Sequence, residues 1–290
     1  MKCIITALML SLLITPSFAC NLDGTSGIVE DNDLFIPVDQ YRNAGLNEEK
    51  FNEVIEKIEA IYSPVITGMG AKLVINRRWS NGTANANASR DGKKWTVNMY
   101  GGLARHETIT EDGFALVVCH ELGHLVGGAP SMGIYGKPMA NEGQSDYFAV
   151  TKCLRKTFLY DDNSTIVSLM TVPATLSGAC MKAFPNKAEQ NICIRTGMAG
   201  SSVADFFAAI KKRPVAKFDT PDPAVVSRTS SSHPAHQCRL DTYFQGSLCE
   251  VSFNEDVDSE KMKDEVKGTC HPSLGFTTGL RPLCWFKPKI

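Results

Sequence analysis

Residues 117–128 read VVCHELGHLVGG, and this stretch places two histidines four positions apart. On an α-helix, residues i and i+4 lie on one face, with their Cβ atoms about 5–6 Å apart. His120 and His124 can therefore both face one metal ion. Glu121 is rotated by about 100° from His120, which places its carboxylate beside the metal rather than on it.

The flanking residues predict that this stretch is helical. Thr110 can cap the start of a helix, and the acidic residues Glu111 and Asp112 favour its positive end. The pair Gly127-Gly128 can end it. The alternative is a buried helix with two histidines that bind no metal, because a pattern as short as HExxH also occurs by chance.

A second motif, NEGQSD at 141–146, follows on a helix expected to run from near Asn141 past Cys153. Glu142 and Asp146 are again four apart on one face. Glu142 can be the third ligand, and Asp146 can accept the outer N–H of His120 and fix its tautomer. A catalytic zinc ion takes three protein ligands and a water, so we expect one Zn²⁺. An acidic first helical turn is the alternative, as is an exchange of roles between the two carboxylates.

These motifs resemble those of the gluzincin metallopeptidases, in which HExxH is followed by NExxSD. The stretch SHPAHQCRLD at 232–241 resembles a segment of the CAAX prenyl protease-like family, in its soluble exported branch. The resemblance implies a zincin-like fold and a zinc peptidase. It also implies that His233 and Arg239 lie near the active site.

The chemistry predicts hydrolysis of peptide bonds by Glu-assisted attack of zinc-bound water. Glu121 takes the proton from the water and passes it to the leaving amine. His233 is the candidate donor to the oxyanion, with His236 as the alternative. Arg239 can support His233, bind a substrate carbonyl, or form only a surface salt bridge. Two other functions stay open: a non-catalytic periplasmic metal-binding or chaperone-like protein, and a zinc amidase that acts on the cell wall.

The fold expected from the sequence is α+β. Strands are expected at 72–79, 84–90 and 94–100, in a small antiparallel sheet with a hairpin turn at Asp91-Gly92. A helix at 47–61 should end at Pro64, and 129–140 should be a loop. Residues 20–290 are expected to form one metallopeptidase domain. Its first lobe, about 20–128, holds the sheet and the HELGH helix; its second, about 129–290, is mainly helical and stapled by disulfides.

A peptidase must also hold an extended peptide, usually by adding it to an exposed sheet edge. The strand at 95–100 precedes the HELGH helix, so Asn98, Tyr100 and Gly101 are the candidate substrate-binding residues. An ordinary core hairpin is the alternative. His106 lies in an expected loop and is interpreted as structural. Residues 20–45 look irregular and could cover the cleft.

The N-terminus has the pattern of a signal peptide at 1–19, with a basic Lys2, an apolar run and small residues up to Ala19. Cleavage would leave Cys20 first, so we expect secretion or a periplasmic location, with a lipoprotein anchored through Cys20 as the alternative. No later apolar run is long enough to span a membrane. The net charge of −1 argues against nucleic-acid binding.

Nine cysteines remain after Cys3 is removed with the signal, and in an exported chain they are more often disulfides than free thiols. The expected pairs are Cys180–Cys193, Cys238–Cys249 and Cys270–Cys284. Cys119 and Cys153 are further candidates, since a bridge between them would tie the two motif-bearing helices together. A thiolate ligand at Cys119 is less favoured, because its side chain points away from the ligand face.

Overall fold

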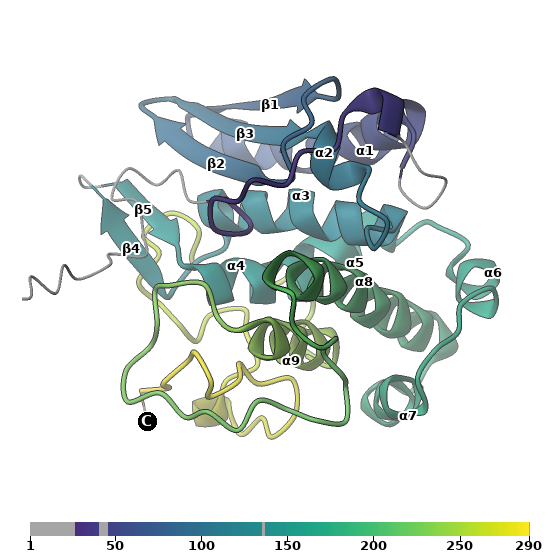
Figure 1. The fold of residues 1–290 in the computed structure, drawn as a ribbon. Coiled ribbons are helices and arrows are strands. Elements are labelled where there is room, and N and C mark those ends of the chain that lie inside the picture. The colour runs from purple at the N-terminus through teal and green to yellow at the C-terminus, as the bar shows by residue number, and fades with distance from the viewer. Residues whose placement is uncertain (1–26, 41–45, 135–136, 290) are drawn as a thin grey trace, which may run out of the picture.

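The computed structural model of the protein describes residues 27–40, 46–134 and 137–289. Its fold is α+β, built around the buried helix α3 (Glu111–Val126). A three-stranded sheet lies on one side of α3, and α4 (Glu142–Phe148), α8 (Lys187–Lys211) and α9 (His236–Ser247) lie on the other (Figure 1). The main hydrophobic core contains residues from both sides of α3, from Ile28 to Val257, so α3 is its central element.

The sheet has the order β1–β3–β2 and is mixed. It consists of β1 (Lys72–Arg78), β2 (Ala86–Asp91) and β3 (Lys94–Tyr100). The hairpin partners β2 and β3 are antiparallel, as expected, but β1 runs parallel to β3. The expectation of a purely antiparallel sheet is therefore wrong. Residues 79–85 after β1 carry the chain past β3, so that it enters the sheet again on the far side as β2.

Alternation along β3 determines which face of the sheet is dry. Trp95, Val97 and Met99 are buried, whereas the residues between them are partly exposed. Successive side chains on a strand point to opposite faces, so one apolar face packs onto the core.

Helix α1 spans Glu48–Gly68 and is longer than expected, because Pro64 lies inside it. Proline removes a backbone donor and usually ends or kinks a helix. Pro64 is exposed, so water can bind the carbonyl group that loses its partner. The helix continues for another turn, in which Ile66 is buried beyond Tyr62.

Helix α3 begins and ends where the sequence indicates. The Thr110 hydroxyl accepts a hydrogen bond from the Gly113 N–H at its start, and Gly127 follows its last residue. Almost every residue between is buried, so the helix is covered by other elements on all sides.

The second motif begins a long helical run that packs against α3. It consists of α4 (Glu142–Phe148), the π-helical η2 (Ala149–Cys153) and α5 (Leu154–Phe158). Asn141 caps its start. Gly123 of α3 lies against Ser145, where an added Cβ would come within 2.9 Å of the Ser145 Cα. The absence of a side chain at Gly123 therefore permits close approach of the two motif-bearing helices.

The region expected as a loop at 129–140 instead holds the antiparallel pair β4 (Ser131–Ile134) and β5 (Lys137–Ala140). The glycines and prolines in this stretch favoured the prediction of a loop, so the ribbon was missed. Helix α9 spans His236–Ser247, and the proline-rich stretch before it is extended. The remaining elements are η1 (Val38–Gln40), α2 (Gly101–Ala104), α6 (Asn163–Ser168), α7 (Ala174–Ala183), α8 (Lys187–Lys211) and η3 (Pro272–Leu274).

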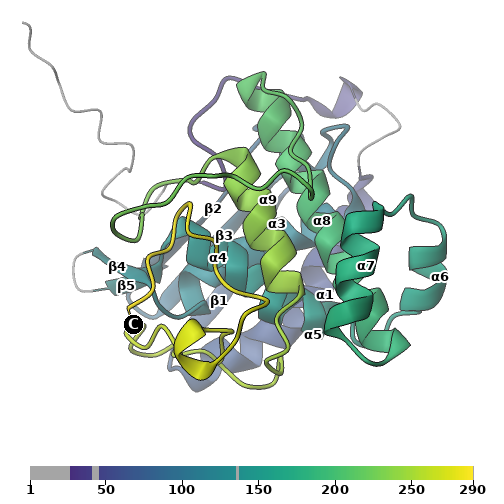
Figure 2. The ribbon, with the colours of Figure 1, turned by 90° about the horizontal axis from the view of Figure 1, so that it is seen from below.

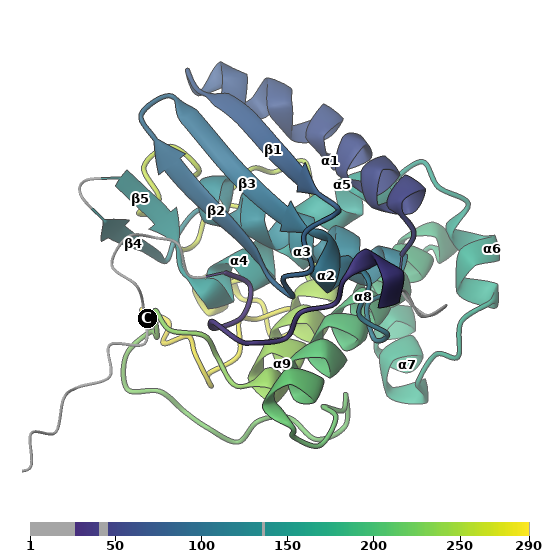
Figure 3. The ribbon, with the colours of Figure 1, turned by 45° about the horizontal axis from the view of Figure 1, so that its top comes forward.

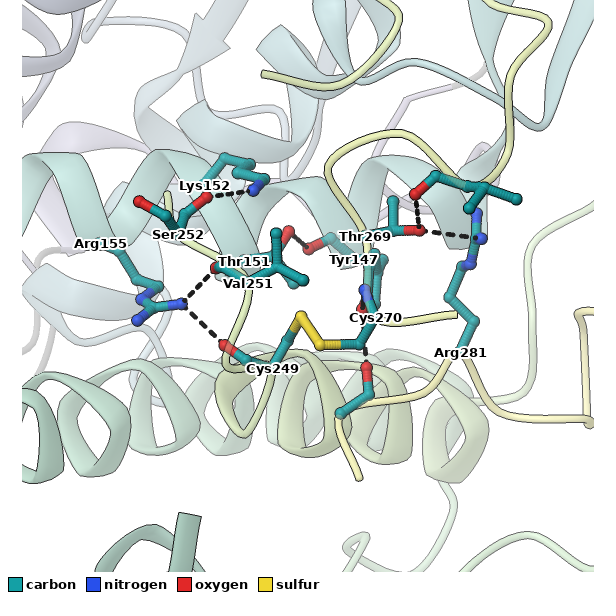
Figure 4. Close-up of a disulfide and its surroundings, with 12 residues drawn as sticks. Tyr147, Thr151, Lys152, Arg155, Cys249, Val251, Ser252, Thr269, Cys270 and Arg281 are labelled. Carbon is teal, nitrogen blue, oxygen red and sulfur yellow. Dashed lines mark hydrogen bonds between the residues drawn. A yellow bond between two sulfur atoms is a disulfide. The ribbon is translucent and has the colours of Figure 1, made fainter. Parts of the chain in front are cut away.

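The C-terminal segment after α9 is mostly irregular and lies beside α4 and α9 (Figure 2). It does more than cover the surface, because Trp285 and Phe286 are buried. The Trp285 ring lies directly over Gly143, where an added Cβ would come within 2.3 Å of it. Side chains of the α4–α5 run bind the backbone of this segment (Figure 4): Arg155 donates to the Cys249 carbonyl group, and Lys152 to that of Ser252. These bonds fix backbone that has no strand or helix partner.

Four disulfides link Cys119 to Cys153, Cys180 to Cys193, Cys238 to Cys284, and Cys249 to Cys270. The first two match the expected pairs. The pairs Cys238–Cys249 and Cys270–Cys284 are wrong, because the tail folds back so that Cys284 meets α9. Cys20 and the proposed signal peptide lie outside the described residues. Among those described, no helix is long and apolar enough to cross a membrane.

We expect loss of the Cys119–Cys153 bridge to weaken both folding and metal binding. The bridge closes a loop of 34 residues, so the double serine variant should unfold with a free energy about 4 kcal/mol lower in the chain-entropy model. Chemical denaturation and metal titration measure the two effects. The matched control removes Cys180–Cys193, which spans 13 residues and lies away from the metal centre. The free energy of unfolding of that control should fall by about 3 kcal/mol, with no change in its metal affinity. Equal metal affinity in both variants would contradict the expected link between the Cys119–Cys153 bridge and metal binding.

Candidate metal centre

His120, His124 and Glu142 come together between α3 and α4. Their candidate ligand atoms lie within 4.8 Å of one another. His120 Nε2 is 3.3 Å from Glu142 Oε2, and His124 Nε2 is 3.6 Å from Glu142 Oε1. All three residues are buried. This group could hold a metal ion.

Hydrogen bonds determine which nitrogen of each histidine is free. His120 Nδ1 donates to Asp146 Oδ1 at 2.8 Å, and His124 Nδ1 donates to the Ala140 carbonyl oxygen at 2.8 Å. When both rings are neutral, as metal ligands must be, their Nε2 atoms carry lone pairs. Neither Nε2 has a hydrogen-bond partner within the described part of the chain. Two lone pairs and a carboxylate that converge in a buried site repel one another unless a cation lies between them, so the donor set fits a metal ion.

Charges around the site shift the pKa values of these ligands in the metal-free protein. Burial lowers the pKa of His120, but the Asp146 and Glu142 carboxylates outweigh this and raise it to about 9. Burial dominates for His124 and lowers its pKa to about 4. Burial raises the pKa of Glu142, but the neighbouring histidines prevail and hold it well below its usual range.

Asp146 lies behind His120 at the centre of a buried network. Its carboxylate accepts hydrogen bonds from His120 Nδ1, from Nε and Nη2 of Arg239, and from the Tyr243 hydroxyl group, all within 2.8 Å. Burial raises the pKa of Asp146, but the charges of Arg239 and His120 outweigh it and lower the pKa. The carboxylate therefore stays ionised and orients the His120 ring.

Arg239 is part of this buried network behind His120. It does not bind His233 or form a surface ion pair; it is buried and pairs with Asp146. Tyr243, four residues further along α9, was missed by the sequence reasoning. The i+4 spacing from Arg239 is the signal that could have indicated it, since both side chains then project from one face of α9.

Glu121 is fully buried beside the ligands, and neither of its oxygens has a hydrogen-bond partner among the described residues. Burial raises its pKa to about 8 in the metal-free protein. A carboxylate this isolated is costly to keep without a compensating charge, and a bound dication would supply that charge and lower its pKa.

His233 and His236, the two alternatives for an oxyanion donor, lie in different places. His233 Nε2 is 3.3 Å from Glu142 Oε2 and donates to the Gly27 carbonyl oxygen at 2.8 Å. His236 Nε2 instead donates to the Pro214 carbonyl oxygen at 2.9 Å, at the start of α9. Only His233 therefore borders the metal centre.

The expected peptide-binding strand is not an edge. β3 is central, with β1 on one side and β2 on the other, so its backbone has no free face for a peptide. Asn98 bonds side chains on both neighbouring strands, Asn76 and Asn87, and Gly101 is buried. The substrate-binding role expected for Asn98, Tyr100 and Gly101 thus has no support.

His106 is nearly buried and bonds the Thr108 hydroxyl group through Nδ1 at 2.9 Å. Its ring packs edge-on against Phe206, which fits the structural interpretation. Comparisons of the chain with models of known protein families, with curated proteins and with solved structures find no match.

Metal binding should release protons. At neutral pH the pKa of about 9 keeps His120 protonated in the metal-free protein, and a ligand must lose its proton to bind. Affinity should therefore rise about tenfold or more per pH unit between about pH 6 and pH 8. Calorimetry in two buffers of different ionisation enthalpy measures the protons released. His124→Ala should abolish stoichiometric binding, with His236→Ala as the control; a pH-independent affinity would contradict the assigned protonation.

Asp146→Asn should weaken metal binding about 10–100-fold, because His120 loses the carboxylate that orients it. The variant also leaves the Arg239 guanidinium buried without its partner, which should lower the free energy of unfolding by about 3–5 kcal/mol. Tyr243→Phe is the matched control, since it removes one hydrogen bond and should cost only about 1 kcal/mol. Metal titration and denaturation measure both; parent-like affinity in Asp146→Asn would show that the network has no influence on the metal centre.

Proposed function

We propose that the protein is a zinc-dependent peptidase of the gluzincin type, with a zincin-like fold. The observation that carries the proposal is Glu121, a buried side chain next to three convergent ligand atoms, whose carboxyl oxygens have no hydrogen-bond partner among the described residues. A structural zinc site uses four protein ligands, whereas a catalytic site uses three and keeps one position open. A site that only stored metal would not need an additional carboxylate beside it.

His120, His124 and Glu142 would hold the zinc ion. When bound, zinc acts as a Lewis acid that makes water more acidic and polarises a carbonyl group. Glu121 takes a proton from the attacking water and carries it to the leaving amine. His233 donates from Nε2 to the oxygen that becomes negative, and Asp146 keeps the His120 ring in the required orientation.

The peptide would bind along β2 rather than β3. β2 is an edge strand of its sheet and packs against α3. Its first residue accepts a hydrogen bond from Ile28, and the neighbouring Gly27 contacts His233 beside the metal ligands. Extended substrates add to such an edge through main-chain hydrogen bonds. The four disulfides support an exported location, since they persist in oxidising compartments.

Glu121→Gln should keep the metal and lose about 10²–10⁴-fold in peptide hydrolysis, because the amide cannot accept the proton. Zinc-loaded parent and variant are incubated with a reduced, unfolded protein and, separately, with purified peptidoglycan, and the products are identified by mass spectrometry. Peptide products from the parent alone support the proposal. Products from peptidoglycan only would indicate an amidase, no products would indicate a binding protein, and full activity in the variant would contradict the role of Glu121.

A further inference from the structure

The segment Gly27–Val29 lies against the candidate metal centre. His233 Nε2 donates a hydrogen bond of 2.8 Å to the Gly27 carbonyl oxygen. The same nitrogen lies 3.3 Å from Glu142 Oε2. His233, the proposed donor to a substrate carbonyl group, therefore already donates to the carbonyl group of Gly27.

The next backbone groups along this segment are also held. The Ile28 N–H donates to the Ala86 carbonyl oxygen at 3.0 Å, in the edge strand β2. The Ile28 carbonyl oxygen accepts from Arg239 Nη1 at 2.5 Å, and that of Val29 accepts from Asn85 Nδ2 at 3.0 Å. Main-chain groups on both sides of the Gly27–Ile28 bond are therefore bound, as an extended peptide at a sheet edge requires.

The segment runs in the opposite direction to the edge that it covers. Further along, Phe35 forms an antiparallel bridge with Thr83, and the Ile36 N–H donates to the Gly82 carbonyl oxygen at 2.7 Å. Figure 3 shows this segment, in dark purple, between the start of β2 and α9. The chain thus passes the candidate metal centre at Gly27, contacts the first residue of β2 through Ile28, and then runs antiparallel to residues 82–84, which lead into that strand.

Packing fixes which peptide bond lies at the centre. An added Cβ on Gly27 would come within 2.1 Å of Asn85 Oδ1 and 2.3 Å of the Ala86 carbonyl oxygen. Ile28 and Val29 are 0% and 2% exposed. A shift by one residue would force a side chain into the space at Gly27 and turn the buried side chains outward, so the register is set.

We propose, on the basis of the proposed function, that the protein hydrolyses its own Gly27–Ile28 peptide bond. The bond between the Gly27 carbonyl carbon and the Ile28 nitrogen breaks, and water supplies an oxygen to Gly27. Gly27 leaves as a carboxylate, and the Ile28 nitrogen gains both protons of the water, with Glu121 as the carrier, and becomes an ammonium group. No other reactant is needed. The mature chain begins at Ile28, and His233 is released from the Gly27 carbonyl group.

The test compares the zinc-loaded full chain with its Glu121→Gln variant, by intact mass and N-terminal sequencing. The parent should begin at Ile28, and the variant should retain Gly27 and residues before it. A parent that cuts an added peptide but retains Gly27 would overturn self-processing and leave the peptidase proposal standing. A parent that does neither would overturn both. A variant that also begins at Ile28 would assign the cut to another protease and overturn the inference.

A second measurement does not depend on catalysis. In the Glu121→Gln chain, Gly27→Ala should displace the segment, because the new methyl group has no room beside Asn85. A chelator should then remove zinc about fivefold faster or more, because a displaced segment needs less free energy to open the site. Gly178→Ala is the matched control, because nothing lies within 4 Å of an added Cβ there. Equal rates in the two variants, with both folded, would overturn the placement of the segment.

Discussion

The Asp146 carboxylate is the interaction on which the metal centre depends. It lies fully buried on α4 and binds His120 of α3 together with Arg239 and Tyr243 of α9. Three helices from distant parts of the sequence are therefore held by one anion. Such a charge is stable in a protein interior only when it is paired and its oxygens are hydrogen-bonded, and four hydrogen bonds meet that requirement here.

The buried charges of the wider site balance only when protons or a metal ion neutralise part of them. The buried carboxylates of Glu121, Glu142 and Asp146 face one guanidinium group, that of Arg239. With neutral histidines this leaves two negative charges, which a divalent ion would neutralise. Without metal, protons take its place, which explains the raised pKa values of His120 and Glu121. Protons and a divalent ion are thus alternative ways to neutralise these buried carboxylates.

The surrounding fold keeps the two ligand-bearing helices in register. Gly123 lets α3 approach α4 closely, and the Cys119–Cys153 bridge links the same helices further along. On the other side of α4, Trp285 of the C-terminal segment covers Gly143. A metal site needs ligands placed to within a fraction of an ångström. Here close packing, a covalent link and a buried ring each limit movement of the helices.

Residue spacing was enough to predict the local elements of this protein. Helical spacing within HELGH and NEGQSD, with caps at Thr110 and Asn141, predicted two helices whose side chains could converge on a metal ion. Alternation likewise predicted β3, since both patterns depend on residues only two to four positions apart. The pairing of Cys119 with Cys153 was expected because a bridge between them would tie these two helices together.

Only the tertiary structure decided features that join distant residues. β3 became the central strand because β1 and β2 flank it, and Cys284 pairs with Cys238 because the tail folds back onto α9. Likewise, Arg239 pairs with Asp146 and not with His233. The start of the edge strand β2 is bound by the chain's own residue Ile28. No periodic pattern along the sequence predicts these contacts. They arise from packing between elements and not from the geometry of any one element.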